Sequence, residues 1–168
     1  MTKSIQMQRP MPRPIIIGID VDSTITISTS HDKDGNLLMG KMRKGADVVI
    51  RRLYQQGYII SIITGRTRSQ EILDFDLFMS EHNIPFHYFN SNPPWLPWVA
   101  EKGIDPRKCY ADIMIDDKNL GGLPEDWETI YSIIQSDIEK IKASAKTSLQ
   151  EKLDKVLGTL RRTESKEK

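Results

Sequence analysis

The sequence predicts an α/β fold in which a doubly wound parallel sheet carries a small β-hairpin flap and a C-terminal helical extension. Short apolar runs of strand length alternate along the chain with segments of helical periodicity. Three of the apolar runs end in polar residues, at Asp20, Thr64 and Asp116. A chain of 168 residues, 38% of them hydrophobic, is long enough to build one ordinary domain around such a sheet.

A strand, a hairpin and a helix are predicted in the first part of the chain. Residues 15–20 form a continuous apolar run that ends in an aspartate, which is typical of a strand buried on both faces of a parallel sheet. Residues 25–29 and 37–39 have strand character on either side of an Asp-Gly pair, so they predict a hairpin. Apolar residues then recur at helical spacing from 46 to 56, and Gly57 closes that helix.

Three more strands and a second helix are predicted after Gly57. The apolar run 58–63 predicts a buried strand, and a helix follows over about 68–82. Residues 86–89 and 112–115 predict the third and fourth strands of the sheet. Because helices or long connections separate these strands, right-handed crossovers would make them parallel.

A long amphipathic helix is predicted at the C-terminus. Pro124 suits the first turn of a helix, and apolar residues recur at mostly three- and four-residue spacing from Ile130 to Leu160. This stripe is longer than one edge of a small sheet requires, so we expect it to pair with the same stripe of a second copy in a homodimer. A break near 144–148 that folds the helix back on itself is the alternative.

The predicted organisation is a flexible leader over 1–14, a core over 15–135 and a helical tail over 136–168. No apolar run approaches the roughly 18 residues that a bilayer span needs, and the leader lacks the apolar segment of a secretory signal. The single cysteine, Cys109, excludes an internal disulfide. These features favour a cytoplasmic protein without a membrane partner.

Polar side chains follow the predicted strands at their carboxyl ends, which is the edge where parallel α/β sheets bind ligands. They are Asp20, Asp22, Thr64, Arg66, Asp116 and Asp117, and Gly65 adds a backbone N–H between Thr64 and Arg66. Carboxylates alone would repel a phosphate dianion, whereas Mg²⁺ can bridge carboxylate and phosphate oxygens. The set therefore predicts a Mg²⁺ site that binds a phosphate monoester, with a lysine to balance the surplus negative charge.

The same residues suggest roles in phosphoryl transfer. Asp20 can attack phosphorus to form an aspartyl-phosphate, and Asp22 can protonate the leaving oxygen and then deprotonate water. The Thr64 hydroxyl and free backbone N–H groups at Thr64 and Gly65 can bind phosphate oxygens. Arg66 is equally compatible with a phosphate contact and with a solvated helix start.

These motifs resemble those of the haloacid dehalogenase (HAD) superfamily. Residues 20–24, Asp-Val-Asp-Ser-Thr, match its first motif, Asp-x-Asp-x-Thr, except that Ser23 stands where the family usually has glycine. Thr64 matches the second motif, and the pair Asp116-Asp117 matches the fourth. The resemblance covers about residues 15–134, and it extends to a subgroup of small bacterial HAD phosphatases that lack a cap domain.

The resemblance implies a Rossmann-like HAD core and a Mg²⁺-dependent phosphatase that works through an aspartyl-phosphate. It implies that Mg²⁺ is bound by the Asp20 carboxylate, the Asp22 backbone carbonyl and one or both of Asp116 and Asp117. Lys108 is the best candidate for the catalytic lysine of the third motif, and Lys102 is the alternative.

Three other functions are compatible with parts of this pattern. A response-regulator receiver uses an acidic pair, a threonine and a lysine, but in a different order along the chain. A non-catalytic binding module would be expected to lose carboxylates that are all present here. A nucleic-acid end-processing phosphatase would use the basic tail, although a net charge of +1 does not favour it.

Neither segment between the motifs is long enough for a full cap, so we expect an open site that acts on a phosphorylated small molecule, such as a metabolite or a nucleotide.

Overall fold

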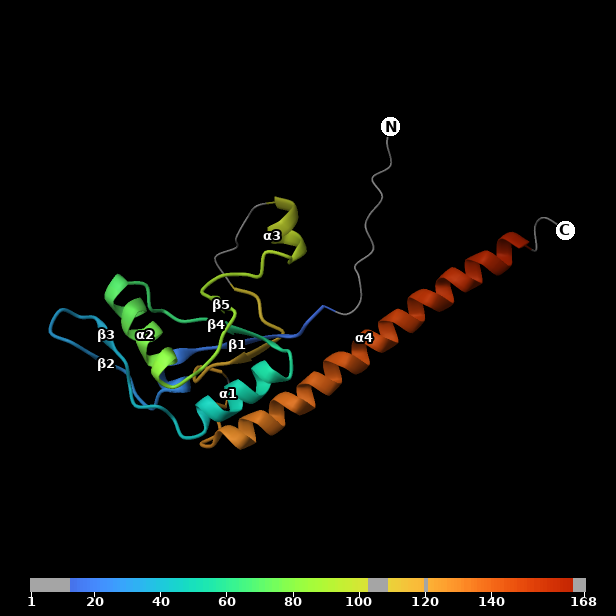
Figure 1. Cartoon of the computed structure of the whole chain (residues 1–168). Helices are drawn as coiled ribbons and strands as arrows, with labels where there is room; N and C mark the ends of the chain where they lie inside the picture. The colour runs from blue at the N-terminus through green and yellow to red at the C-terminus, as the bar shows by residue number, and fades with distance from the viewer. Residues whose placement is uncertain (1–12, 103–108, 120, 165–168) are drawn as a thin grey trace. The chain divides into compact units, whose positions relative to one another are not determined.

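Residues 13–102, 109–119 and 121–164 are described by the computed structural model. Their centre is a sheet of four strands in the order β5-β4-β1-β6 (Figure 1). The strands are β1 (Ile16–Ile19), β4 (Ile59–Ile62), β5 (Tyr88–Phe89) and β6 (Ile113–Ile115). Every neighbouring pair in this sheet is parallel. The predicted α/β fold with a parallel, Rossmann-like sheet is therefore confirmed.

The isoleucine-rich runs form the middle of the sheet, where β1 and β4 have neighbours on both edges. Five of their side chains have no exposed surface: Ile16, Ile17, Ile19, Ile60 and Ile62. A strand covered on both faces needs an apolar residue at every position, which explains why these runs are continuous and do not alternate. β-Branched side chains also suit the pleated surface of a sheet.

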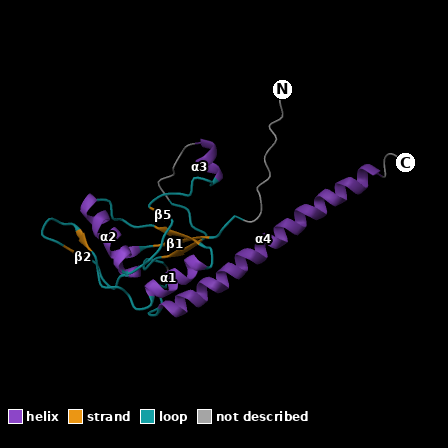
Figure 2. Ribbon diagram, viewed as in Figure 1, coloured by secondary structure: helices purple, strands orange, loops and turns teal. Residues whose placement is uncertain are grey.

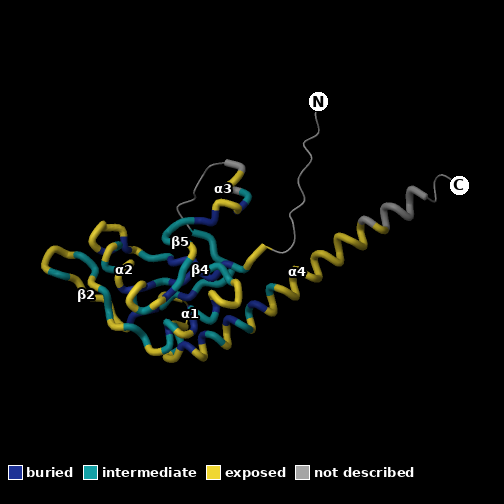
Figure 3. Tube along the Cα trace, viewed as in Figure 1, coloured by how far each residue is buried: buried dark blue, intermediate teal, exposed yellow. Residues whose placement is uncertain are grey.

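Three helices belong to the same part of the chain: α1 (Ala46–Gln55), α2 (Ser69–Glu81) and α3 (Pro97–Lys102) (Figure 2). Burial is concentrated in the central strands and on one face of α1 (Figure 3), where Val49, Ile50 and Leu53 recur at helical spacing and are fully buried. α1 connects β1 to β4 and α2 connects β4 to β5, so right-handed crossovers place both helices on one face of the sheet.

The predicted hairpin is present, but its first arm is only partly a strand: Thr26 forms an isolated antiparallel bridge with Met42, and the Ile27 N–H donates to the Lys41 carbonyl at 2.9 Å. Val21–Ile25 forms a short π-helical turn, η1, and the antiparallel strands are β2 (Ser30–His31) and β3 (Leu37–Leu38). The Asp32 carboxylate accepts hydrogen bonds from the backbone N–H groups of Asp34 and Asn36, both at 2.8 Å. This side-chain turn fixes which residues pair, so the strands lie directly beside it.

Two helices in the second half of the chain extend the predicted fold. Helix α3 lies in the Pro-rich segment after β5, for which the sequence predicted no helix, and Pro97 occupies its first position, where a missing N–H costs nothing. The predicted long C-terminal helix is present as α4 (Trp127–Glu164), and it runs through 144–148, so the alternative of a break there is wrong. Ser144, Thr147 and Ser148 do not interrupt it, and the Thr147 hydroxyl donates to the Ala143 carbonyl at 3.1 Å.

The chain divides into two compact units, Met1–Glu128 and Thr129–Lys168, and α4 makes up the described part of the second. Along α4, Leu149, Leu153 and Leu157 follow one another at four-residue spacing and are 49%, 51% and 43% exposed. The homodimer through this stripe remains a prediction, as does the domain boundary after residue 135.

The predicted leader lies outside the described residues except for Arg13 and Pro14. The Arg13 guanidinium binds Asp112 at the start of β6, with 2.7 Å from Nη1 to Oδ2. Among the helices that the structure describes, none combines the length and the apolar character that crossing a membrane requires.

Gly18 is required by close packing in the middle of β1. A Cβ atom there would lie 2.8 Å from Met114 Sδ, 2.9 Å from Ala111 Cβ and 2.9 Å from Ile63 Cδ1. We expect Gly18→Ala to lower the free energy of unfolding by about 1–3 kcal/mol, as overpacked cores do. Urea denaturation would measure this loss, and adding Ala111→Gly should restore part of it. An unchanged urea midpoint would contradict the prediction.

Candidate active site

Three carboxylates meet at the carboxyl edge of the sheet. Asp20 directly follows β1, and Asp116 and Asp117 follow β6, which is the neighbour of β1 in the sheet. One oxygen of each lies within 4.8 Å of the others, and all three residues are half-buried. The positions of these residues therefore agree with the sequence-based prediction that they gather at one edge of the sheet. An all-oxygen group of this kind suits Mg²⁺ or Ca²⁺.

Thr24 holds two of these carboxylate residues in place. Its hydroxyl donates to Asp20 Oδ2 at 3.1 Å and accepts the backbone N–H of Asp117 at 3.0 Å. Thr24 is fully buried, and the Asp20 N–H donates to the Ile115 carbonyl at 2.9 Å. No role was predicted for Thr24, although its place in the Asp-x-Asp-x-Thr motif was the available signal.

The electrostatics of the group favour a cation. The pKa of Asp20 is raised to about 6: burial is the largest cause and the charges of Asp116 and Asp22 add to it, while hydrogen bonds from the Val21 backbone and the Thr24 hydroxyl partly oppose the rise. An ionised Asp20 is therefore destabilised in the absence of a positive charge. A divalent ion among the three carboxylates would remove that cost.

Asp22 lies apart from this group. Its carboxylate pairs with the Arg66 guanidinium, with 2.6 Å between Oδ1 and Nη2, and its side chain is not one of the three that converge. Asp20 precedes the turn η1 and Asp22 lies within it, where Asp22 and Ser23 have non-helical backbone angles. The contact of the Asp22 backbone carbonyl with Mg²⁺ remains a prediction.

Ser23 adopts a left-handed conformation, with φ 64° and ψ 3°. This conformation is one that glycine adopts without steric cost, which gives a physical reason for the glycine that resembling sequences carry here. We expect Ser23→Gly to raise the melting temperature by about 2–4 °C. The free energy gained by relieving backbone strain should exceed the free-energy cost of the more flexible unfolded chain by roughly 0.5–1 kcal/mol. Calorimetry beside Ser23→Ala, which keeps the Cβ atom, would check this, and a lower melting temperature for the glycine variant would contradict it.

The loop after β4 has fewer free backbone N–H groups than predicted. The N–H of Thr64 is not free, because it donates to Asn90 Oδ1 at 2.8 Å. The Thr64 hydroxyl accepts the Arg66 N–H at 3.3 Å. Gly65 is exposed, and no described residue accepts a hydrogen bond from its N–H. The groups left for phosphate in this loop are the Thr64 hydroxyl and the Gly65 N–H.

Asn90 is a second residue whose role the sequence analysis missed. It follows β5 and has a positive φ of 44°, which asparagine tolerates better than most residues. Its side chain holds the Thr64 backbone from the neighbouring strand. This contact could not be predicted, because nothing in the local sequence pattern pairs Asn90 with Thr64, 26 residues away.

The Arg66 side chain is fully buried, so the solvated helix start considered for it is wrong. Each guanidinium nitrogen donates to a protein acceptor: Nε and Nη2 to Asp22, and Nη1 and Nη2 to carbonyls of β3. A direct contact between this buried side chain and phosphate remains a prediction that this arrangement does not favour.

Neither predicted lysine can be placed. Lys108 lies outside the described residues, and Lys102 ends α3 without a described side chain. Lys118 is a cation that the structure does show beside the carboxylates, with Nζ 2.5 Å from Asp117 Oδ2 and its side chain 82% exposed. The hydrogen bond to Asp117 raises the pKa of Lys118, and the charges of Asp116 and Asp20 add to the effect.

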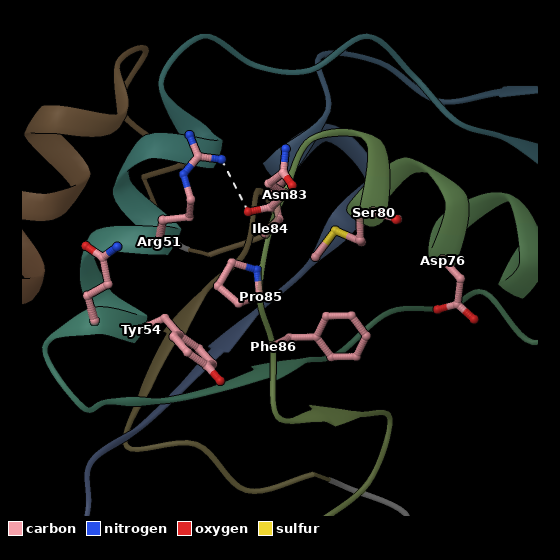
Figure 4. Close-up of a pocket in the computed structure, with 10 residues that line it drawn as sticks. Arg51, Tyr54, Asp76, Ser80, Asn83, Ile84, Pro85 and Phe86 are labelled. Carbon is pink, nitrogen blue, oxygen red and sulfur yellow. Dashed lines mark hydrogen bonds between the residues drawn. The ribbon is translucent and has the colours of Figure 1, made fainter.

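An open pocket lies away from this site. The C-terminal halves of α1 and α2 and residues 83–86 line it (Figure 4), so it is near the amino ends of β4 and β5. The Arg51 guanidinium inside it is bound to the carbonyls of His82 at 2.7 Å and Asn83 at 3.3 Å and to the Asp47 carboxylate at 2.6 Å. The pocket contains none of the predicted site residues.

Comparison with known proteins supports the fold. No protein-family model matches the chain, and no curated protein does. Among solved structures it is similar to a conserved protein coded by a locus of Bacteroides thetaiotaomicron, which is 25% identical. That match has a TM-score of 0.57 and covers 74% of this chain and 92% of the other.

A second match is to a Vibrio cholerae protein assigned as a 3-deoxy-D-manno-octulosonate 8-phosphate phosphatase, with 21% identity, a TM-score of 0.37 and coverage of 69% and 60%. This likeness is too low to support an argument. The chain has a parallel sheet, a hairpin after the first strand of that sheet and carboxylates at the edge of the sheet. With the likeness to the Bacteroides protein, these features make its α/β core consistent with a HAD-like hydrolase.

Proposed function

We propose that this protein is a Mg²⁺-dependent phosphohydrolase of the HAD type that acts on phosphate monoesters. The observation that carries the proposal is the convergence of Asp20, Asp116 and Asp117 at the carboxyl edge of the sheet. The Asp20 carboxylate and the Asp117 backbone are joined there through one buried hydroxyl, that of Thr24. Mg²⁺ held by these carboxylates would neutralise negative charge on the phosphate.

The chain's own groups account for the two transfer steps. An oxygen of Asp20 forms a bond to phosphorus while the bond from phosphorus to the ester oxygen breaks, giving an aspartyl-phosphate and an alcohol. Asp22 supplies the proton that the leaving oxygen takes. In the second step Asp22 takes a proton from water as the water oxygen attacks phosphorus, and Asp20 is released as a carboxylate with inorganic phosphate.

The loop after β4 is suited to hold the non-bridging oxygens of the phosphate. The Thr64 hydroxyl and the exposed Gly65 N–H are the donors there. The described segments between β1 and β4 hold only η1, the hairpin and α1. A small phosphorylated metabolite or a nucleotide is the proposed substrate, because an open site imposes little selection beyond the phosphate itself.

Hydrolysis of an aryl phosphate with and without Mg²⁺ tests the proposal. We expect turnover that depends on Mg²⁺ and a phosphorylated protein that can be trapped by acid quench of a radiolabelled reaction, with the label on Asp20. A panel of phosphorylated metabolites and nucleotides would then identify the preferred substrate. Absence of turnover across the aryl phosphate and the whole panel, with Mg²⁺ present, would overturn the proposed function.

A further inference from the structure

The Arg66 side chain is a buried cation beside the candidate site. It has no exposed surface, although it follows the exposed Gly65. Two of its nitrogens donate to the two oxygens of one carboxylate: Nε to Asp22 Oδ2 at 3.0 Å and Nη2 to Asp22 Oδ1 at 2.6 Å. A guanidinium is a planar fork, so this bidentate pair fixes both the position and the rotation of the carboxylate.

The rest of the guanidinium binds the hairpin. Nη1 donates to the Leu37 carbonyl at 2.8 Å and Nη2 to the Leu38 carbonyl at 2.9 Å. These two residues are the whole of β3. A hairpin with strands of two residues is not stable alone, so the position of β3 depends on side chains such as Arg66. One buried cation thereby joins the hairpin to the loop that carries Asp22.

Glu71 holds the same strand without touching Asp22. Its Oε1 accepts the Leu37 N–H at 3.0 Å, and its Oε2 accepts the N–H groups of Thr67 and Arg68, both at 3.1 Å. These hydrogen bonds, the one from Leu37 first among them, lower the pKa of Glu71. Glu71 is therefore a natural control, because it anchors β3 as Arg66 does but is not bonded to the candidate acid–base residue.

We propose that Arg66 is a positioning residue that orients the Asp22 carboxylate before substrate arrives and makes no contact with the substrate itself. The proposal rests on the proposed function, in which Asp22 moves the protons. The Asp22 side chain keeps 18% of its surface exposed, and each of its oxygens retains a lone pair beyond the one that Arg66 occupies. The carboxylate is thus held from one side and open on the other.

Positioning of this kind matters because proton transfer requires close alignment. A misplacement of about 1 Å in a catalytic group can lower the rate by roughly 100-fold. Asp22 lies between the β1 strand end and the left-handed Ser23, in a turn with non-helical angles. Without the guanidinium, nothing else that the structure describes donates a hydrogen bond to the Asp22 carboxylate. Lysine cannot replace it, since a single ammonium group fixes no rotation.

A double-mutant cycle tests the proposal. Arg66→Gln, Asp22→Asn and the double variant are compared on an aryl phosphate with a good leaving group, with Asp20→Asn as the activity floor. We expect Arg66→Gln to lower kcat about 100-fold with KM within about 3-fold of wild type, and Arg66→Lys not to restore kcat. Because Arg66 acts through Asp22, the double variant should be no slower than Asp22→Asn alone.

Glu71→Gln gives the matched control for loss of hairpin support. We expect it to lower kcat by less than about 5-fold and to combine multiplicatively with Asp22→Asn. If Arg66→Gln raises KM by more than 10-fold, or if its effect multiplies with that of Asp22→Asn, then Arg66 contacts phosphate and the proposal is wrong. If Glu71→Gln and Arg66→Gln lower kcat equally, Arg66 only supports the hairpin, and the proposal that it positions Asp22 is wrong.

A readout that does not depend on catalysis separates this proposal from the proposed function. The Nε–H resonance of Arg66 should exchange slowly with solvent in the intact chain, and Asp22→Asn should speed that exchange at least 10-fold. Fast exchange in the wild-type protein would overturn the Arg66–Asp22 pair even if the enzyme is active. Slow exchange in a protein that hydrolyses no phosphate ester would confirm the Arg66–Asp22 pair but overturn the phosphatase assignment. The catalytic role proposed for the pair would then be wrong as well.

Discussion

Asp20→Asn is expected to lower phosphatase turnover by at least about 10³-fold while the fold is retained. The amide can still accept the hydrogen bond from the Thr24 hydroxyl, which lies 3.1 Å from Asp20 Oδ2. It cannot serve as the attacking carboxylate, and removal of a covalent nucleophile costs several orders of magnitude. The loss should appear in kcat for an aryl phosphate, with circular dichroism unchanged.

Asp76→Asn is the matched control for this variant. It makes the same chemical change at an exposed position of α2 that lines the open pocket near the amino ends of the strands. We expect its turnover to equal that of the wild-type chain. If Asp20→Asn kept more than about a tenth of the wild-type rate, Asp20 would not be the nucleophile.

The same substitution should change how the stability of the metal-free protein depends on pH. Burial holds the pKa of Asp20 at about 6 in the folded chain, above its value near 3.9 in an unfolded one. The folded state therefore binds this proton more tightly, and the wild-type protein gains stability as pH falls from about 6 to about 4. Asp20→Asn should melt at a higher temperature than wild type above pH 6, and the difference should vanish near pH 4. A difference that is constant from pH 4 to 8 would contradict the raised pKa.

The sheet and the acidic site could be predicted because their causes are local in the sequence. Continuous isoleucine runs are what a strand buried on both faces needs, and parallel strands bring their carboxyl ends to one edge. Asp20 and Asp116 follow two such runs, so their convergence at the sheet edge required no knowledge of side-chain packing. The position of each aspartate directly after a predicted strand was therefore enough to predict that the carboxylates lie at one edge of the sheet.

The roles of Arg66 and Asn90 could not be predicted, because their partners are distant in the sequence. Arg66 binds Asp22, 44 residues away, and Asn90 binds Thr64, 26 residues away. An arginine after a glycine in a polar loop is typically solvated, whereas the Arg66 side chain is buried and donates to Asp22 and to the carbonyls of Leu37 and Leu38. Such contacts depend on tertiary structure, which periodicity and composition do not encode.

The bounds of the hairpin strands could not be predicted for a related reason. Strand character extends through residues 25–29, but the turn is set by the Asp32 carboxylate and its bonds to Asp34 and Asn36. A side chain that binds its own backbone outweighs weak β-propensity over a few residues. The alternative of a break in the C-terminal helix at 144–148 does not occur, because the cost of serine and threonine in a helix is small beside the loss of backbone hydrogen bonds.

Removal of Mg²⁺ is expected to abolish turnover, and Ca²⁺ should restore it poorly. Carboxylate oxygens of Asp20, Asp116 and Asp117 lie within 4.8 Å of one another, a spacing at which three negative charges repel unless a cation lies among them. Mg²⁺ requires near-octahedral geometry at short distances, whereas Ca²⁺ takes more ligands at longer ones. Turnover should be lost in excess chelator and recover when Mg²⁺ is added back.

The affinity for Mg²⁺ should also depend on pH, because a proton and the metal compete for Asp20. With the metal-free pKa of Asp20 at about 6, the apparent Kd for Mg²⁺ should be nearly constant above pH 7 and should rise by up to about 10-fold per pH unit below about 5.5. Titration calorimetry at several pH values would measure this, and proton release on binding should be close to zero above about pH 7 and should approach one per ion below about pH 5. Asp117→Asn should weaken binding at every pH without changing the pH at which it begins to fall, because it removes a ligand and leaves the burial of Asp20 in place. Full turnover in chelator, or a Kd that does not change between pH 5 and 8, would exclude Asp20 as a metal ligand.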